Sequence, residues 1–185
     1  ELLAKQALIK YDRLDALINN ASTFYPTPIE KFSENDWDAL MGSNLKAPLF
    51  LIQALSEELK KNNGFVINVT DININQTLKN HSIYLAAKSG LNTITRALAK
   101  DLAPYIRVNA IGPGPTLPSI RQSQAQFDRQ IALTPLEAQV DVEEICNAVR
   151  FILAAPAIKG QMIALDGGQH LGWAQPGRDA GDTDE

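Results

Sequence analysis

Short apolar runs alternate with longer amphipathic runs along the chain. Four short runs are almost entirely apolar and predict β-strands at about 15–20, 64–70, 106–112 and 161–168. Strands that are apolar throughout, rather than alternately apolar and polar, are typical of a parallel sheet with both faces covered. Longer runs with apolar positions three and four residues apart predict helices at about 34–61, 82–103 and 141–155.

Local signals predict where these helices begin and end. Ser33 is followed three residues later by an acid, which favours a helix that starts there with a capping box. Pro104 cannot continue the second helix. Asp141 precedes the third helix, whose first turn carries two glutamates that favour the positive end of the helix dipole.

Strands and helices that alternate in this way predict right-handed crossovers and an α/β fold, a Rossmann-like doubly wound parallel sheet. In such a sheet ligands bind beyond the carboxyl ends of the strands. Three predicted strands end in polar loops, at residues 20–25, 71–82 and 113–122. We therefore expect these loops to converge on one site.

Composition suits a single domain. The 185 residues are 45% hydrophobic and 21% charged with a net charge of -4, and they predict one Rossmann-like domain over 1–175 followed by a disordered tail over 176–185. An acidic balance argues against a nucleic-acid partner. The sequence holds no run of 18 apolar residues and no signal-peptide pattern, which favours a cytoplasmic protein that does not cross a membrane.

Cysteine and histidine are scarce. The single Cys146 cannot build a disulfide framework or a zinc cage, so we expect no metal site and interpret this thiol as a small core residue. His81 lies in a predicted loop, and we expect it to be exposed rather than catalytic.

Tyr84 and Lys88 stand four residues apart at the start of the second helix and therefore share a helix face. An ammonium near a phenol favours the phenolate, so we expect Lys88 to lower the pKa of Tyr84 and to fit it for proton exchange with a substrate. The same spacing also arises on helices without function. Asp71, at the end of the preceding strand, has the alternative role of a helix cap or Asx-turn residue.

Five motifs in order support a more specific interpretation. They are "NNAS" at 19–22, "GSNLKAPLF" at 42–50, "YLAAK" at 84–88, "RVNAIGPGPTLP" at 107–118 and "LDGG" at 165–168. Together they resemble the short-chain dehydrogenase/reductase family over nearly the whole chain. The resemblance implies a catalytic set of Asn44, Tyr84 and Lys88. It also implies an NADPH or NADH site that includes Asn20, Ala21, Ser22, Tyr84, Lys88, Pro113 and Gly114.

Two departures narrow the resemblance. The family usually has serine thirteen residues before the tyrosine, where this chain has Asp71. A carboxylate accepts from N–H donors, which suits a nitrogen heterocycle better than a ketone. With "NNASTFYPTP" at 19–28, this resembles the pteridine reductases, which implies that Ser22, Phe24, Asp71 and Tyr84 bind a pterin. Phe24 as a loop anchor, and Thr70 in the serine role, remain alternatives.

The glycine-rich turn by which the family binds the cofactor pyrophosphate does not occur among these residues. By resemblance, the chain begins in the third helix of the fold and lacks the first βαβαβ half. We therefore expect the first strand to be a bare apolar edge, and we expect these residues alone to bind NADPH poorly.

Three hypotheses follow. The first is NADPH-dependent reduction of a C=N bond in a dihydropterin or dihydrofolate, with Asp71 as a fourth catalytic residue beside Asn44, Tyr84 and Lys88. Tyr84, or a water held by Tyr84 and Asp71, would supply the proton, and Asn44 would order the proton relay. The second is a carbonyl reductase of the 3-oxoacyl carrier-protein type. The third is a non-catalytic fragment that keeps the fold for subunit association. The resemblance also implies a homotetramer built through helices 34–61 and 82–103, and a loop at 116–135 that covers the substrate.

Overall fold

The computed structural model describes residues 2–75 and 77–172. Four parallel strands form one sheet in the order β1 (Ala16–Asn19), β2 (Phe65–Val69), β3 (Arg107–Pro113) and β4 (Met162–Leu165). The helices are α1 (Leu2–Tyr11), α2 (Glu34–Met41), α3 (Ala47–Lys61), α4 (Ser82–Asp101), α5 (Gln124–Ala132) and α6 (Val142–Ala154). Short helical turns add η1 (Gly42–Lys46), η2 (Ile72–Asn75) and η3 (Gln169–Leu171). This confirms the predicted α/β fold.

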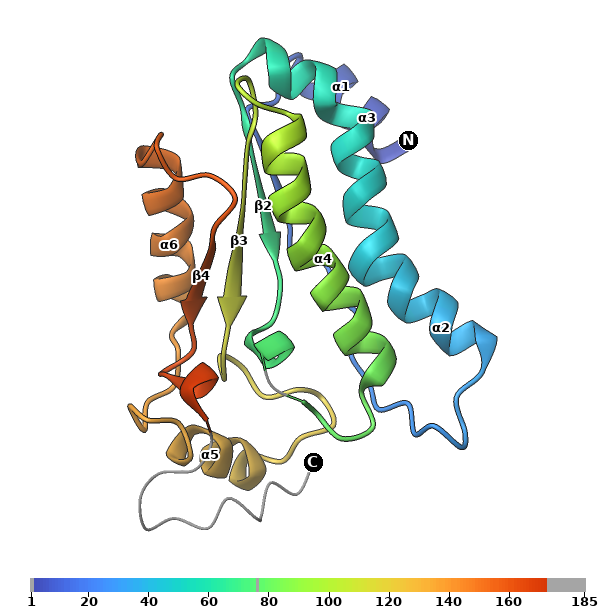
Figure 1. The fold of residues 1–185 in the computed structure, drawn as a ribbon, viewed down its shortest axis with the longest axis vertical. Coiled ribbons are helices and arrows are strands. Elements are labelled where there is room, and N and C mark those ends of the chain that lie inside the picture. The colour runs from blue at the N-terminus through green and yellow to red at the C-terminus, as the bar shows by residue number, and fades with distance from the viewer. Residues whose placement is uncertain (1, 76, 173–185) are drawn as a thin grey trace.

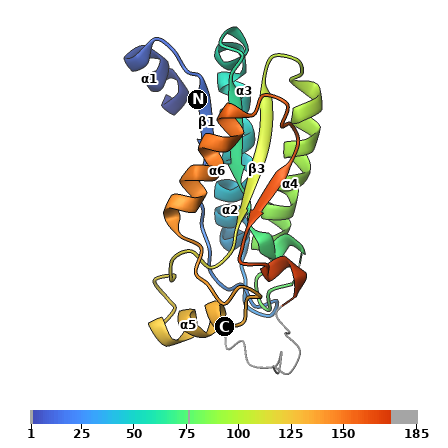
Figure 2. The same ribbon diagram turned by 90° about the vertical axis from the view of Figure 1, so that its left-hand side faces the viewer.

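Helices cover both faces of the sheet (Figures 1 and 2). Val66 and Val108 point from the central strands towards α3 and α4, where they join a core that also includes Ile52 and Leu55. The neighbouring strand residues point the other way and pack with Ala148 and Ile152 of α6. Because successive strand side chains alternate between faces, a central strand needs apolar residues at nearly every position. This explains the continuous apolar runs.

The predicted helix ends are largely confirmed. Ser33 caps α2 in a capping box with Asp36, and Asp141 does the same for α6 with Glu144. The helix predicted over 34–61 is nevertheless interrupted, because residues 42–46 form a π-helical turn between α2 and α3. The segment 116–135, expected to be a loop, contains the helix α5, which begins with a capping box at Ser123.

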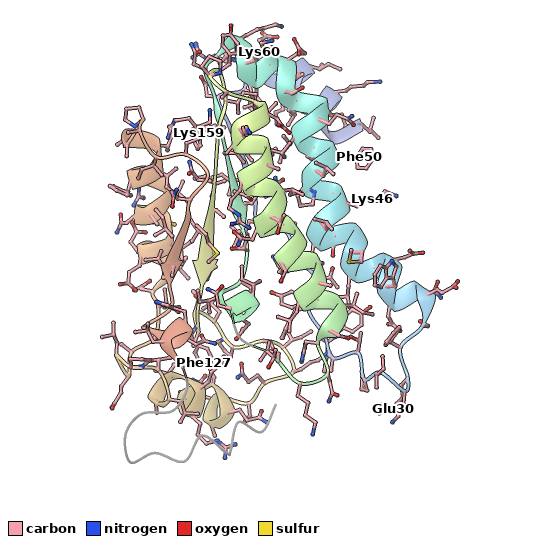
Figure 3. The ribbon with its side chains drawn as sticks, viewed as in Figure 1. Glu30, Lys46, Phe50, Lys60, Phe127 and Lys159 are labelled. Atoms are coloured by element: carbon pink, nitrogen blue, oxygen red, sulfur yellow. The ribbon has the colours of Figure 1, made fainter. Side chains whose placement is uncertain are left out.

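All four strands run in the same direction, so their carboxyl ends meet at one end of the molecule (Figure 1). The turn η2 and the helix α5 lie at this end. Figure 3 shows Phe127 of α5 there, while Lys60 and Lys159 lie at the opposite end. The polar loops predicted to converge do therefore share one region.

The structure also bears on the predictions about the first strand, Cys146, membrane helices and metal ligands. β1 is an edge strand, and Ile18 on it is 45% exposed. Cys146 is partly exposed rather than a core residue. Among the described helices, none is long and apolar enough to cross a membrane. The described residues also hold no group of three or more metal-ligating side chains. The predicted tail at 176–185 lies outside the described residues.

Candidate active site

Two side chains from different elements meet at the carboxyl end of β2. Asp71 follows the strand by two residues, and Tyr84 lies in the first turn of α4. The Tyr84 hydroxyl donates a 2.5 Å hydrogen bond to Oδ2 of Asp71. The backbone N–H of Asn73 donates to Oδ1 at 2.8 Å. Asp71 is therefore an Asx-turn residue, as one interpretation held, and also the partner of Tyr84.

The electrostatics of this pair differ from the expected ones. Burial raises the pKa of Tyr84 well above its ordinary value, and the charge of Asp71 and the hydrogen bond to it raise this pKa further. The expectation that Lys88 lowers the pKa of Tyr84 is wrong, because Asp71 is the charged group bonded to the phenol. Burial also raises the pKa of Asp71, while bonds from Tyr84 and Asn73 oppose the rise. Tyr84 keeps its proton at neutral pH, as a proton donor must.

Lys88 lies beneath the tyrosine ring. Its ammonium is 5.8 Å from the centroid of the Tyr84 ring and donates a 2.8 Å hydrogen bond to the carbonyl of Val69. Burial lowers the pKa of Lys88 to about 8, and the charge of Asp71 opposes this. An ammonium has three N–H donors, and the Val69 carbonyl takes one. Lys88 therefore has donor capacity for a ligand hydroxyl.

Asn44 and Ser22 are bonded to each other next to this pair. The Ser22 hydroxyl donates to Oδ1 of Asn44 at 2.6 Å, and the nearness of Ser22 to Tyr84 opposes the rise in the tyrosine pKa. The Asn44 amide donates to the carbonyls of Thr23 and Leu40. In a regular α-helix the Leu40 carbonyl would accept the backbone N–H of residue 44. The π-helical turn thus lies where Asn44 is hydrogen-bonded to Ser22 and Thr23 of the neighbouring loop.

Phe24 packs within an aromatic cluster. Its ring stacks on His81 with centroids 4.7 Å apart and meets Tyr84 edge-on at 4.8 Å. Phe24 remains 36% exposed, so packing as a loop anchor leaves part of its surface accessible. The prediction that His81 is exposed is wrong: it is 4% exposed, and Nδ1 lies 2.7 Å from the Lys79 carbonyl.

A cavity of about 340 Å³ opens beside the pair. Asp71, Tyr84 and Phe24 form part of its wall, and residues of α5 and of the segment before it form another part. This is within the size range of small-molecule sites. The polar side chains in the wall include an unusual number of amides, listed here: Asn73, Gln122, Gln126, Gln130 and Gln169. Among the described residues, Lys88, Ser22 and Asn44 are not part of the wall.

A chain of amides connects Asp71 to the C-terminal turn. The Asn73 side chain is hydrogen-bonded to Asp71, and its Oδ1 accepts a 2.9 Å bond from Nε2 of Gln169. Gln169 lies in η3, whose start is held by Asp166 through the backbone N–H groups of Gly168 and His170. Residues almost a hundred positions apart therefore orient the same carboxyl group.

The remaining predicted residues surround this region without joining the Asp71 pair. Asn20 and Ala21 are exposed beyond the end of β1, and Pro113 ends β3. Gly114 is part of the cavity wall, but a Cβ there would lie 2.5 Å from Cα of Asp166. Close packing against Asp166 is therefore enough to require glycine. Thr70 is buried and donates to the Ile111 carbonyl, away from Tyr84, which argues against the serine role for it.

Several wall residues were not predicted to belong to the site. His81 lies three residues before Tyr84, so helical spacing alone would place it near the tyrosine. Gln122, Gln126 and Gln130 repeat every four residues, which is the spacing of one helix face. No signal in the sequence connects Asn73 with Gln169.

Comparison with known proteins gives matches over most of the chain. Residues 1–170 match a family model described as "Enoyl-(Acyl carrier protein) reductase". Protein FixR of Bradyrhizobium diazoefficiens is 34% identical over 85% of this chain and 60% of its own length. Pteridine reductase 1 of Leishmania tarentolae is 30% identical over 91% of this chain and 67% of its own length. The 3-oxoacyl-[acyl-carrier-protein] reductase FabG of Thermotoga maritima is 30% identical, over 90% and 70%. The chain thus spans 60 to 70% of the length of these three relatives.

Solved structures are similar as well. The structure of FolM Alternative dihydrofolate reductase 1 from Brucella suis in complex with NADP is 40% identical, with a TM-score of 0.89 over 94% of this chain and 71% of that one. An apo SCOR enzyme from Clostridium thermocellum is 30% identical with a TM-score of 0.82. The similarity extends from the sequence to the three-dimensional fold.

Proposed function

The chain belongs to the short-chain dehydrogenase/reductase family, and we propose that it serves in NADPH-dependent reduction of a pterin-type C=N bond. The observation that carries this proposal is the hydrogen bond between Tyr84 and Asp71 in the cavity wall. A carboxylate there accepts hydrogen bonds from ring N–H and amino groups, which a ketone does not offer. The names of pteridine reductase 1 and of FolM fit this substrate class.

The residues of the chain fit the nicotinamide end of the cofactor. Lys88 is buried, carries donors beyond the one used by Val69, and is not among the residues that line the cavity. Lys88 would hold ribose hydroxyls, while Asn20, Ala21, Ser22, Pro113 and Gly114 would line the nicotinamide groove. The bound cofactor supplies a hydride. NADPH is proposed rather than NADH because FolM was solved with NADP.

The proposed proton step uses side chains already bonded to each other. A hydride added to the carbon of a C=N bond leaves a basic nitrogen, which then takes a proton. Tyr84 holds a proton and lies in the wall, so it would donate directly or through a water. Asp71, whose pKa is raised by burial, would accept hydrogen bonds from the N–H groups of the ring and help to return a proton to Tyr84. Phe24 offers an aromatic face to a flat ring.

The alternative of a 3-oxoacyl carrier-protein reductase is supported by the similarity to FabG. Asp71 argues against it, because a carboxylate next to a substrate carbonyl repels the oxyanion that develops on reduction.

The test is NADPH oxidation by the product of the complete open reading frame that contains these residues. Dihydrobiopterin and dihydrofolate are compared with an acetoacetyl thioester. We expect a preference of at least about 100-fold in kcat/KM for a pterin, the order of effect of a dedicated acid–base group. A preference for the thioester supports the alternative. Absence of turnover with all three substrates favours the non-catalytic hypothesis.

We also propose the homotetramer implied by the family resemblance. Trp37 of α2 and Phe50 of α3 are 47% and 53% exposed, and Figure 3 shows Phe50 on the outer side of its helix. Contiguous apolar patches mark interaction surfaces, and these two aromatic side chains are candidates to belong to one. Light scattering of the purified protein tests this, and a monomer at micromolar concentration contradicts it.

A further inference from the structure

We propose that the mouth of the cavity binds a negatively charged tail of the substrate, and that Arg121 is the residue that selects it. This rests on the proposed pterin reduction and names the substrate class: a dihydropterin with an extended side chain that ends in carboxylates. The inference follows from how charge is distributed in the cavity wall.

Charge is separated along the wall. Among the described residues that form it, Asp71 is the acidic side chain, and it lies at the partly buried end with Tyr84. Arg121 is the arginine in the wall and is exposed at the mouth, where no lysine accompanies it. A ligand that matches both ends has N–H donors in the ring and an anion outside. Because these 185 residues carry a net charge of -4, a local cation is needed to favour an anion.

Arg121 is held beside the aromatic side chains of the site. Its Nη1 donates a 3.0 Å hydrogen bond to the carbonyl of Phe24, and its guanidinium carbon lies 5.8 Å from the centroid of the Tyr25 ring. These two contacts restrain an exposed side chain. A guanidinium has five N–H donors in a planar fork that matches a carboxylate, and the Phe24 carbonyl uses one.

The rest of the mouth suits a tail that is partly apolar and partly amide. Leu117 in the wall is 67% exposed, so it offers apolar surface at the opening. Gln122 and Gln130 extend the wall from the same segment and are bonded to each other at 2.9 Å. A cavity of about 340 Å³ is at the small end of ligand sites, so a bicyclic ring would enter and a long tail would emerge past these residues.

The test compares two substrates in four forms of the enzyme, the wild type and three variants. For each form, kcat/KM is measured with dihydrofolate, which carries an anionic tail, and with dihydrobiopterin, which does not. In Arg121→Gln we expect the ratio of the two values to fall about tenfold, as for loss of a charge-assisted hydrogen bond. Arg121→Lys should retain part of the preference. Arg129→Gln, on the exposed side of α5 and outside the wall, should keep the wild-type ratio.

Two further measurements separate charge from shape. A dihydrofolate whose glutamate carboxylates are esterified keeps the tail but loses its charge, so it should be insensitive to Arg121→Gln. Added salt should weaken the preference for dihydrofolate, because an exposed ion pair is screened. An equal loss with both pterins in Arg121→Gln would show that Arg121 acts only by supporting Phe24, which overturns the inference and leaves the proposed function intact. If the wild type turned over neither pterin, both the inference and the proposed function would be overturned.

Discussion

The Tyr84 hydroxyl donates a 2.5 Å hydrogen bond to a carboxylate oxygen of Asp71, thirteen residues earlier in the chain. The bond crosses from the loop after β2 to the first turn of α4, and it lies in the wall of a cavity at the carboxyl ends of the strands. It unites the two residues on which the proposed chemistry depends, an acid that keeps its proton and a carboxyl group that accepts from ring nitrogens.

Replacing Tyr84 with phenylalanine removes the proposed proton donor while keeping the ring that packs on Phe24. We expect kcat with a dihydropterin to fall at least about 100-fold, the lower range of general acid catalysis. The melting temperature should change little, because only the hydroxyl is lost. Steady-state kinetics and a thermal melt check this together. Full activity in Tyr84→Phe would exclude the proton role of this residue.

Asp71→Asn tests the electrostatic cost of the buried carboxyl. Burial raises the pKa of Asp71, so its charged form destabilises the fold at any pH above the ordinary value of about 3.9. Removing the charge should raise Tm at pH 8 by about 2 to 4 °C, the shift that 1 kcal/mol produces in a domain of this size. The gain should shrink as the pH falls through the raised pKa and vanish below about 3.9, where the carboxyl is protonated in both states.

Asp36→Asn is the matched control with the opposite sign. The hydrogen bonds from Ser33 lower the pKa of Asp36, so its charge stabilises the fold above the ordinary pKa. This variant should melt at a lower temperature at pH 8, and the loss should fade on acidification. Melting curves for both variants between about pH 3 and 8, which includes the ordinary Asp pKa of about 3.9, are sufficient. If both variants shift in the same direction at pH 8, the role of burial at Asp71 is wrong.

Much of the fold follows from local sequence patterns. The central strands are buried on both faces, so their apolar runs could be recognised without knowing their neighbours. Capping residues such as Ser33 and Asp141 act within three residues of themselves, which is why they were predicted correctly. The interruption at residues 42–46 was not predictable in this way, because Asn44 there accepts a hydrogen bond from Ser22 and donates one to the Thr23 carbonyl, both outside its own helix.

In the candidate site, too, relations within one helix were predictable and relations between distant segments were not. Tyr84 and Lys88 share one helix, so their spacing already relates them. The shift of the Tyr84 pKa was predicted with the wrong sign. This shift depends on burial and on Asp71, and the helix spacing indicates neither of them. Gln169 could not be connected with Asp71 at all, because Asn73 joins them only after β4 and β2 are assembled in one sheet.

Gln169→Glu tests whether this amide chain orients Asp71. The Gln169 Nε2 donates to Oδ1 of Asn73, and a glutamate cannot donate there when ionised. We expect the Asn73 amide to turn its N–H groups towards residue 169 and away from Asp71. Loss of that bond and a new negative charge nearby should both raise the pKa of Asp71. The part of the pH–kcat/KM profile that reports the titration of Asp71 should therefore move to higher pH.

His170→Gln is the control, since His170 is in the same turn but is bonded to Asp166 instead. It should leave the position of that limb unchanged. A Gln169→Glu enzyme with an altered Tm and the wild-type pH profile would show that Gln169 supports only the turn.

Gly114→Ala tests why a glycine lies in the cavity wall. An added Cβ would be 2.5 Å from Cα of Asp166 and 3.0 Å from its carbonyl oxygen, and backbone atoms cannot move aside cheaply. We expect the free energy of unfolding to fall by about 2 kcal/mol or more, within the range for overpacking, and Tm to be several degrees lower.

Gly42→Ala is the control: Gly42 has a helical φ of -58° and no neighbour within 4 Å, so alanine should be neutral or stabilise by about 0.5 kcal/mol. Both melts are measured with and without NADPH. If Gly114→Ala keeps the wild-type Tm without NADPH but loses the stabilisation that NADPH gives, the glycine is required by the cofactor and not by Asp166.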